Sequence, residues 1–137
     1  MTLKDYLNTK DSFAADNGMF LTQVTPEFSL AEMTVDEHHL NGAGICQGGA
    51  LFTLADLAIA AAMNACGNVT VGLENAMTFR HPARMGDHLT AKAFVTSDHR
   101  KIPFCHVEIM NEQGDLIASG TSLGWRKAEP MEFESLM

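Results

Sequence analysis

The chain has 137 residues, 46% hydrophobic and 19% charged, which is typical of one globular domain over residues 1–137 rather than of a disordered or fibrous chain. A formal net charge of −8 argues against nucleic acid and against an anionic membrane surface as partners. Three cysteines without paired or zinc-type spacing, together with a start that lacks a signal-peptide core, predict a cytoplasmic protein without a metal site.

The first part of the chain contains one predicted helix, two predicted strands and a loop. Apolar residues recur at helical spacing over residues 2–16, and Gly18 is a plausible end for this helix. The short alternating runs 19–25 and 28–36 indicate two strands around a proline. A loop rich in glycine and asparagine follows over residues 38–47.

The second part contains the most apolar helix and four further strands. Residues 48–65 predict a helix about 25 Å long at ~1.5 Å per residue, with Gly67 just beyond its end. The strand-like runs that follow are separated by turn sequences and cover residues 69–80, 89–97, 103–110 and 116–126. The tail, about 128–137, has four apolar residues among acids, and we expect it to be loose.

These elements predict an α+β domain. Consecutive strands joined by short turns form antiparallel sheets. A helix that is apolar on most of its surface must be covered on most sides, which favours a sheet that wraps around it. The alternation in residues 89–95 and 105–109 supplies one apolar face for this contact.

Asp56 is the only charged residue in the apolar helix. No Lys or Arg occurs between Lys10 and Arg80. At helical spacing Thr53, Asp56 and Asn64 fall on one stripe, which we expect to leave the core and to face water, a partner subunit or a ligand. One interpretation is a solvated residue on an exposed face. The other is a functional carboxylate, because a charge in apolar surroundings needs partners.

Two glycines open the same helix. Gly48 and Gly49 allow a ligand to approach backbone N–H groups that have no partner within the helix, where the helix dipole adds positive charge. Such a site can stabilise an oxyanion, although glycines also serve a tight turn equally well. Asp56 lies two turns further on, ~10 Å along the axis. This separation favours a site shared between two copies of the chain.

The segment from His39 to Ala65 resembles the hotdog-fold acyl-CoA thioesterases, in particular the phenylacetate-pathway group, also called PaaI-like. The resemblance extends over roughly residues 15–127, and it implies an antiparallel sheet around one long central helix. The matching motifs are Asn41-Gly42, Gln47-Gly48-Gly49 and Leu54-Ala55-Asp56.

The resemblance implies a catalytic role for four residues. Asp56 is expected to activate water or to attack the thioester itself, and the Gly48 N–H to polarise the thioester carbonyl. Asn41 is expected to position the water or the partner's carboxylate. Gln47 stands where the family often has histidine; it can donate a hydrogen bond but cannot carry a proton.

The resemblance also implies a homodimer, paired into a tetramer, with the acyl group in a tunnel between subunits. No cofactor is expected, since coenzyme A is part of the substrate. Basic side chains at strand ends are candidates for the coenzyme phosphates. The substrate-binding candidates are Gly49, Phe52, Leu57, Met77, Arg80, Arg100 and Lys101.

Other side chains near these motifs are weaker candidates. We expect His38 and His39 to be exposed, and Cys46 to be a small buried packing residue. The same fold also fits a non-catalytic acyl-CoA-binding protein, in which Gln47 reflects lost catalysis. Dehydration of a hydroxyacyl thioester ranks last, because the chain lacks the histidine and glutamate pairing of such enzymes.

Overall fold

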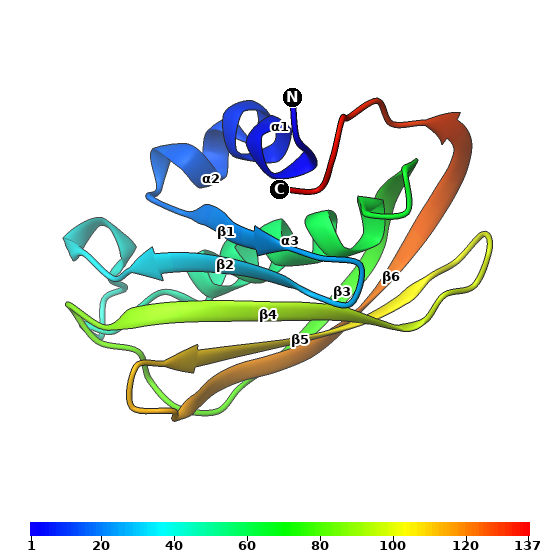
Figure 1. Ribbon diagram of the computed structural model, residues 1–137. Helices are drawn as coiled ribbons and strands as arrows, with labels where there is room; N and C mark the ends of the chain where they lie inside the picture. The colour runs from blue at the N-terminus through cyan, green and yellow to red at the C-terminus, as the bar shows by residue number, and fades with distance from the viewer.

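The computed structural model describes residues 1–137 and consists of one curled sheet, one central helix and a small helical cover (Figure 1). All strand pairs are antiparallel, in the order β1-β2-β4-β5-β6-β3. No helix is both long and apolar enough to cross a bilayer. The elements are α1 (Leu3–Lys10), α2 (Ser12–Asp16), β1 (Phe20–Val24), β2 (Ser29–Thr34), η1 (Glu37–His39), α3 (Gly48–Asn64), β3 (Asn68–Phe79), β4 (His88–Ser97), β5 (Phe104–Asn111) and β6 (Leu116–Pro130).

The concave face of the sheet packs around α3, which confirms the predicted α+β architecture. Leu54 and Leu57 on α3 are fully buried, as are the inward residues of β4 and β5, for example Leu89 and Val107. Burying a leucine or valine side chain stabilises the fold by about 1.5–3 kcal/mol. The apolar helix therefore holds the sheet in its curled form.

The N-terminal segment forms two helices where the sequence predicted one. Asp11 lies between α1 and α2 with φ −82° and ψ 83°, which is not a helical conformation. Its side chain accepts a hydrogen bond from the Ala14 N–H at 3.0 Å, and such a cap starts a new helix. The spacing of apolar residues continues through this break, so periodicity alone did not reveal it.

The C-terminal tail differs from the expected loose segment. β6 continues to Pro130, and Met131, Phe133 and Leu136 then pack against the core. Two N–H groups at the start of α1, those of Leu3 and Lys4, donate to carbonyl groups of the tail at 2.9 and 3.1 Å. The two ends of the chain therefore lie together beside α1 (Figure 1).

The predicted polar stripe on α3 leaves the core at only one end. Asn64 is just 4% exposed, against the expectation that it faces outward. Its amide donates to the carbonyls of Ala60 and Thr70 at 2.8 and 3.1 Å, and its side-chain oxygen accepts from the Thr70 N–H at 2.8 Å. Asn64 is buried because β3 turns back over the end of α3, and the amide satisfies the backbone there.

Candidate active site

The N-terminal end of α3 opens between two cavities. Gln47 precedes the helix in an extended conformation, with no hydrogen bond from its side chain to the helix. Ala50 donates to the Gln47 carbonyl at 3.0 Å, whereas no backbone carbonyl of the chain accepts from the Gly48 N–H. This N–H at the positive end of the helix dipole is therefore available to a ligand oxygen.

Both glycines at this end lie against neighbouring side chains. A Cβ at Gly48 would lie 3.0 Å from the ring of Phe79, and one at Gly49 only 2.5 Å from the side-chain oxygen of Gln47. A side chain at either position would displace its neighbour. The glycines thus allow close packing at the helix start, in addition to leaving the backbone accessible.

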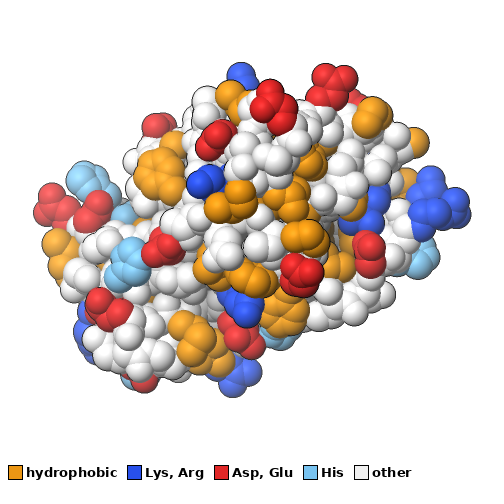
Figure 2. Space-filling model, viewed as in Figure 1, with side chains coloured by type: hydrophobic (Ala, Val, Ile, Leu, Met, Phe, Trp, Pro, Cys, Tyr) orange, Lys and Arg blue, Asp and Glu red, His pale blue; other side chains and the backbone are white.

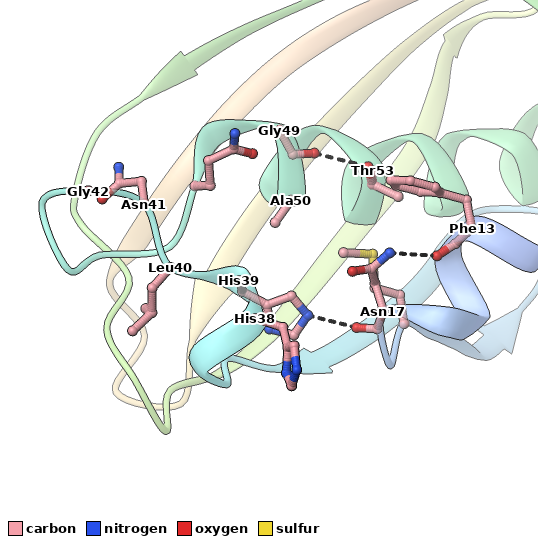
Figure 3. Close-up of a pocket in the computed structure, with 12 residues that line it drawn as sticks. Phe13, Asn17, His38, His39, Leu40, Asn41, Gly42, Gly49, Ala50 and Thr53 are labelled. Atoms are coloured by element: carbon pink, nitrogen blue, oxygen red, sulfur yellow. Dashed lines mark hydrogen bonds between the residues drawn. The ribbon is translucent and has the colours of Figure 1, made fainter.

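The first cavity, of about 470 Å3, lies between α2, η1 and the start of α3 (Figure 3). Its walls are partly polar and partly apolar, and the polar side chains include His38, Asn41, Gln47 and Thr53. Thr53 donates back to the Gly49 carbonyl at 2.9 Å, so its hydroxyl proton is already used. The cavity contains the sequence-predicted residues Asn41, Gln47 and Gly49, and it lacks Asp56.

The second cavity, of about 460 Å3, is more apolar and lies beyond Gly48. Leu51, Phe79 and Arg80 line it, and Asn41 borders both cavities. The Asn41 side-chain oxygen accepts from Ala43 and Ile45 N–H groups at 2.9 and 3.3 Å, which closes the loop. The side-chain oxygen of Asn41 therefore already accepts hydrogen bonds within the loop, whereas its two amide N–H groups remain available as donors.

Asp56 lies on the exposed side of α3 and lines neither of these cavities. Two shallower hollows, of about 370 and 390 Å3, contain Asp56 together with Phe52 and Asn75. The Asn75 amide donates to Asp56 Oδ1 at 2.8 Å, and Ser122 donates to the Asn75 oxygen at 2.5 Å. The sequence reasoning missed Asn75 and Ser122, because no motif or spacing connects them to Asp56.

The three predicted tunnel residues have different positions. Phe52 borders the hollows at Asp56 and contacts the Phe79 ring edge-on, with 6.1 Å between the ring centroids. Met77 is half-buried and packs against the core. Leu57 is only 1% exposed and lies in the core, so its predicted place in a tunnel is wrong within this chain. It follows the exposed Asp56 directly, and the helical turn directs it toward the sheet.

The basic candidates lie at opposite ends of the molecule. Arg80 borders the cavity at Gly48, and its Nε donates to Ser119 at 3.3 Å. Arg100 and Lys101 belong to the β4–β5 loop, and Lys101 lies 5.6 Å from the Trp125 ring centre. Figure 2 shows Lys and Arg side chains gathered at the end of the molecule where Figure 1 places this loop. Within one chain, Arg80 therefore lies far from Arg100 and Lys101.

Of the three weaker candidates next to the Asn41 and Gly48 motifs, two are buried and one is exposed. His39 is 4% exposed, which corrects the expectation that it faces solvent; the Asp36 N–H donates to its Nδ1 at 3.0 Å, and its Nε2 contacts the Asn17 carbonyl at 2.8 Å. His38 is exposed as predicted. Cys46 is buried as predicted, and burial raises the pKa of its thiol to about 11. A thiol with this pKa is not a nucleophile near neutral pH.

Comparisons with known proteins identify the family of the chain. Residues 43–118 match the family model of the thioesterase superfamily. A putative esterase of Archaeoglobus fulgidus is 31% identical over 127 residues, covering 93% of this chain and 82% of that protein. The acyl-coenzyme A thioesterase PaaI of Escherichia coli is 35% identical over 108 residues, covering 79% of this chain and 77% of that protein.

The fold comparison gives the same result. The structure of the E. coli PaaI protein from the phenylacetic acid degradation operon superposes with a TM-score of 0.90 at 30% identity, covering 95% of this chain and 94% of that one. The family-model match includes the whole of α3 with its two glycines and Asp56. The chain therefore belongs to the thioesterase superfamily, in its PaaI-like group with the hotdog fold, and is a thioesterase.

Proposed function

We propose that this enzyme hydrolyses acyl-CoA thioesters to a free acid and coenzyme A, with Asp56 as the catalytic carboxylate. The name of the E. coli relative, an acyl-coenzyme A thioesterase, supports the substrate class. The observation that carries the assignment is the position of Asp56, a carboxylate exposed on an otherwise apolar helix beside two hollows. No packing role of the fold requires a charge there.

Asp56 has two chemical routes to the same products. As a general base it takes a proton from water, the water oxygen bonds to the thioester carbon, and the C–S bond breaks. The proton then passes to the leaving thiolate. As a nucleophile, the carboxylate bonds to the carbon first, coenzyme A leaves, and water hydrolyses the resulting anhydride. Both routes need an ionised carboxylate facing the thioester carbon.

The start of α3 supplies the complementary group. Negative charge develops on the carbonyl oxygen during attack, and the free Gly48 N–H at the positive end of the helix is suited to stabilise it. Gln47 is exposed beside it and can add a neutral hydrogen bond. Asn41 has amide N–H groups available to position the water or the carboxylate.

Gly48 and Asp56 act together only if two copies of the chain meet. They border different cavities and lie ~12 Å apart along the helix, at ~1.5 Å per residue. β3 is an edge strand with exposed Val71, Leu73 and Phe79, a surface suited to pairing with a second copy. A homodimer would then place Asp56 of one subunit near Gly48 of the other, and a dimer of dimers is the larger assembly we propose.

Substrate recognition divides into an apolar and a charged part. The edge-on pair Phe52 and Phe79 lies between Asp56 and Gly48 and favours an aryl-acyl group. Arg80 at the cavity mouth, and Arg100 with Lys101 on the β4–β5 loop, are proposed to contact the coenzyme phosphates.

No separate cofactor is needed for this hydrolysis. The three cysteines are free, which fits the proposed cytoplasmic location.

Thiol release from aliphatic and aryl-acyl-CoA substrates tests the proposal. We expect Asp56→Asn to lower kcat by roughly a hundredfold or more, since an amide can neither take the proton nor attack. Asp16→Asn, an exposed aspartate at the end of α2, is the matched control and should retain the wild-type rate. Wild-type turnover by Asp56→Asn would refute the proposed function.

One observation favours a second candidate function. The side-chain oxygen of Gln47 lies beside Gly49, at a position where the resemblance to the family implies histidine, and glutamine cannot carry a proton there. A chain that binds acyl-CoA without hydrolysing it would show saturable binding in calorimetry and no thiol release in either the wild type or Asp56→Asn. Turnover by the wild type excludes this alternative.

A further inference from the structure

The strand that faces Asp56 contains an irregularity. In β3, Gly72 lies opposite Gly124 of β6, but Glu74 lies opposite Leu123, the next residue of that strand. Leu73 is therefore an extra residue without a partner, which makes a β-bulge. Because side chains alternate along a strand, one extra residue exchanges the two faces for everything that follows.

The bulge decides which residue of β3 lies toward α3 at the level of Asp56. Thr70, before it, is buried on the inner face. Strict alternation from Thr70 would place Glu74 on that face, against the carboxylate of Asp56. The bulge instead leaves Glu74 exposed and turns the half-buried Asn75 inward. The side chain that contacts Asp56 is thus an amide donor and not a second carboxylate, while Glu74 and Asp11 line the hollows that contain Asp56.

A third side chain holds this amide. Ser122 lies directly opposite Asn75 in β6, is only 2% exposed, and donates to the Asn75 oxygen at 2.5 Å. An ionised carboxylate only accepts hydrogen bonds, so Asn75 must present its NH2 to Asp56 and its oxygen to the serine. The orientation of the amide is therefore fixed at both ends, and the 2.8 Å contact falls on one carboxylate oxygen, Oδ1.

We propose that Asn75 is a positioning residue for catalysis: held by Ser122, it fixes the Asp56 carboxylate with one oxygen occupied and the other facing the substrate. The inference rests on the proposed function of Asp56. Asn75 donates to a catalytic group and does not itself contact the thioester.

The test uses the full-length enzyme and the thiol-release assay over a range of pH. Asn75→Leu removes the donor with little change of shape. We expect kcat to fall roughly ten- to hundredfold with KM within about twofold, and the acidic limb of kcat/KM to move to higher pH. Asn68→Leu, the same change at the far end of β3, is the control and should behave as wild type.

Two further variants separate positioning from a structural role. Asn75→Asp keeps the shape but faces Asp56 with a second carboxyl group, and it should move the acidic limb by about one pH unit or more. Ser122→Ala leaves the amide free to turn, with an effect in the same direction and smaller than that of Asn75→Leu. Thermal melting of each variant verifies that it is folded.

Each outcome decides between explanations. Asn75→Leu and Asn75→Asp with wild-type kcat and pH profile would overturn the inference, and so would lost activity with an unmoved acidic limb. Asp56→Asn, measured in parallel, separates the two proposals. If it retains turnover, the proposed function fails; if it is inactive while both Asn75 variants behave as wild type, only the positioning role fails.

Discussion

The two halves of α3 differ in the burial and the hydrogen bonding of their polar groups. In the C-terminal half, Asn64 is buried, and the fold satisfies both its amide N–H groups and its oxygen. In the N-terminal half, Asp56 is exposed with a single side-chain partner, and the Gly48 N–H has no backbone acceptor. One helix therefore carries a structural polar group at one end and available ones at the other.

The difference follows from how far the sheet curls. β3 leaves the end of α3 through a short turn and packs back over it. Polar groups at this end are therefore buried, and each needs a hydrogen-bond partner because an unpaired buried group destabilises the fold. The start of α3 follows a loop, and cavities lie on two sides of it. Polar groups that the fold leaves without full partners are the ones that a substrate can use.

The largest effect on stability is expected from a comparison of Leu57, on the buried face of α3, with Phe52, on its open face. Leu57→Ala should lower the free energy of unfolding by about 2–5 kcal/mol, because it leaves a cavity under the sheet. Phe52→Ala, on the open side, should cost much less and mainly raise KM for aryl-acyl-CoA. Chemical denaturation and thiol-release kinetics measure the two effects. Equal destabilisation by both changes would contradict the contrast.

A smaller stability effect separates the two polar residues themselves. Asn64→Ala leaves buried carbonyl and N–H groups without partners and should cost roughly 1–3 kcal/mol. Asp56→Ala, at an exposed position, should change the free energy of unfolding by about 0.5 kcal/mol or less while abolishing turnover. If Asp56→Ala destabilises the fold as much as Asn64→Ala does, Asp56 is a structural residue.

The smallest effect is expected far from α3, on the outer face of the sheet. Hydrogen bonds from Thr22 and then His88 lower the pKa of Glu32 below its ordinary value of 4.5. The stability from the ionised carboxylate is therefore present above that value and is lost as the pH falls through the lowered pKa. At neutral pH, Glu32→Gln should lower the free energy of unfolding by less than about 1 kcal/mol, seen as a slightly lower Tm. In acid, the difference in Tm between the variant and the wild type should vanish. A stability difference between variant and wild type that grows as the pH falls would contradict the lowered pKa of Glu32.

Most of the fold was predictable because it depends on periodicity. The strands on either side of α3, and α3 itself, follow clear alternating or apolar patterns, and the structure confirms them. Local hydrogen bonds produced the exceptions. A cap at Asp11 divides the first helix, and contacts with α1 order the tail. Such contacts join residues whose spacing carries no periodic signal.

The candidate site was only partly predictable. Asp56, Gly48 and Asn41 stand out in the sequence by charge, by glycine at a helix start and by motif. Asn75 does not, because its face depends on a bulge that the sequence does not mark. Leu57 was misplaced for a related reason: a residue next to Asp56 in sequence points to the opposite side of the helix.

The most direct test of the account is a mixed dimer of Asp56→Asn and Gly48→Val, each inactive as a homodimer and each verified to be folded. If Asp56 of one subunit acts with Gly48 of the other, the isolated heterodimer contains one native site and one doubly altered site. We predict about half of the wild-type kcat. A heterodimer as inactive as both parents would show that Asp56 and Gly48 do not meet across subunits, and would contradict the account.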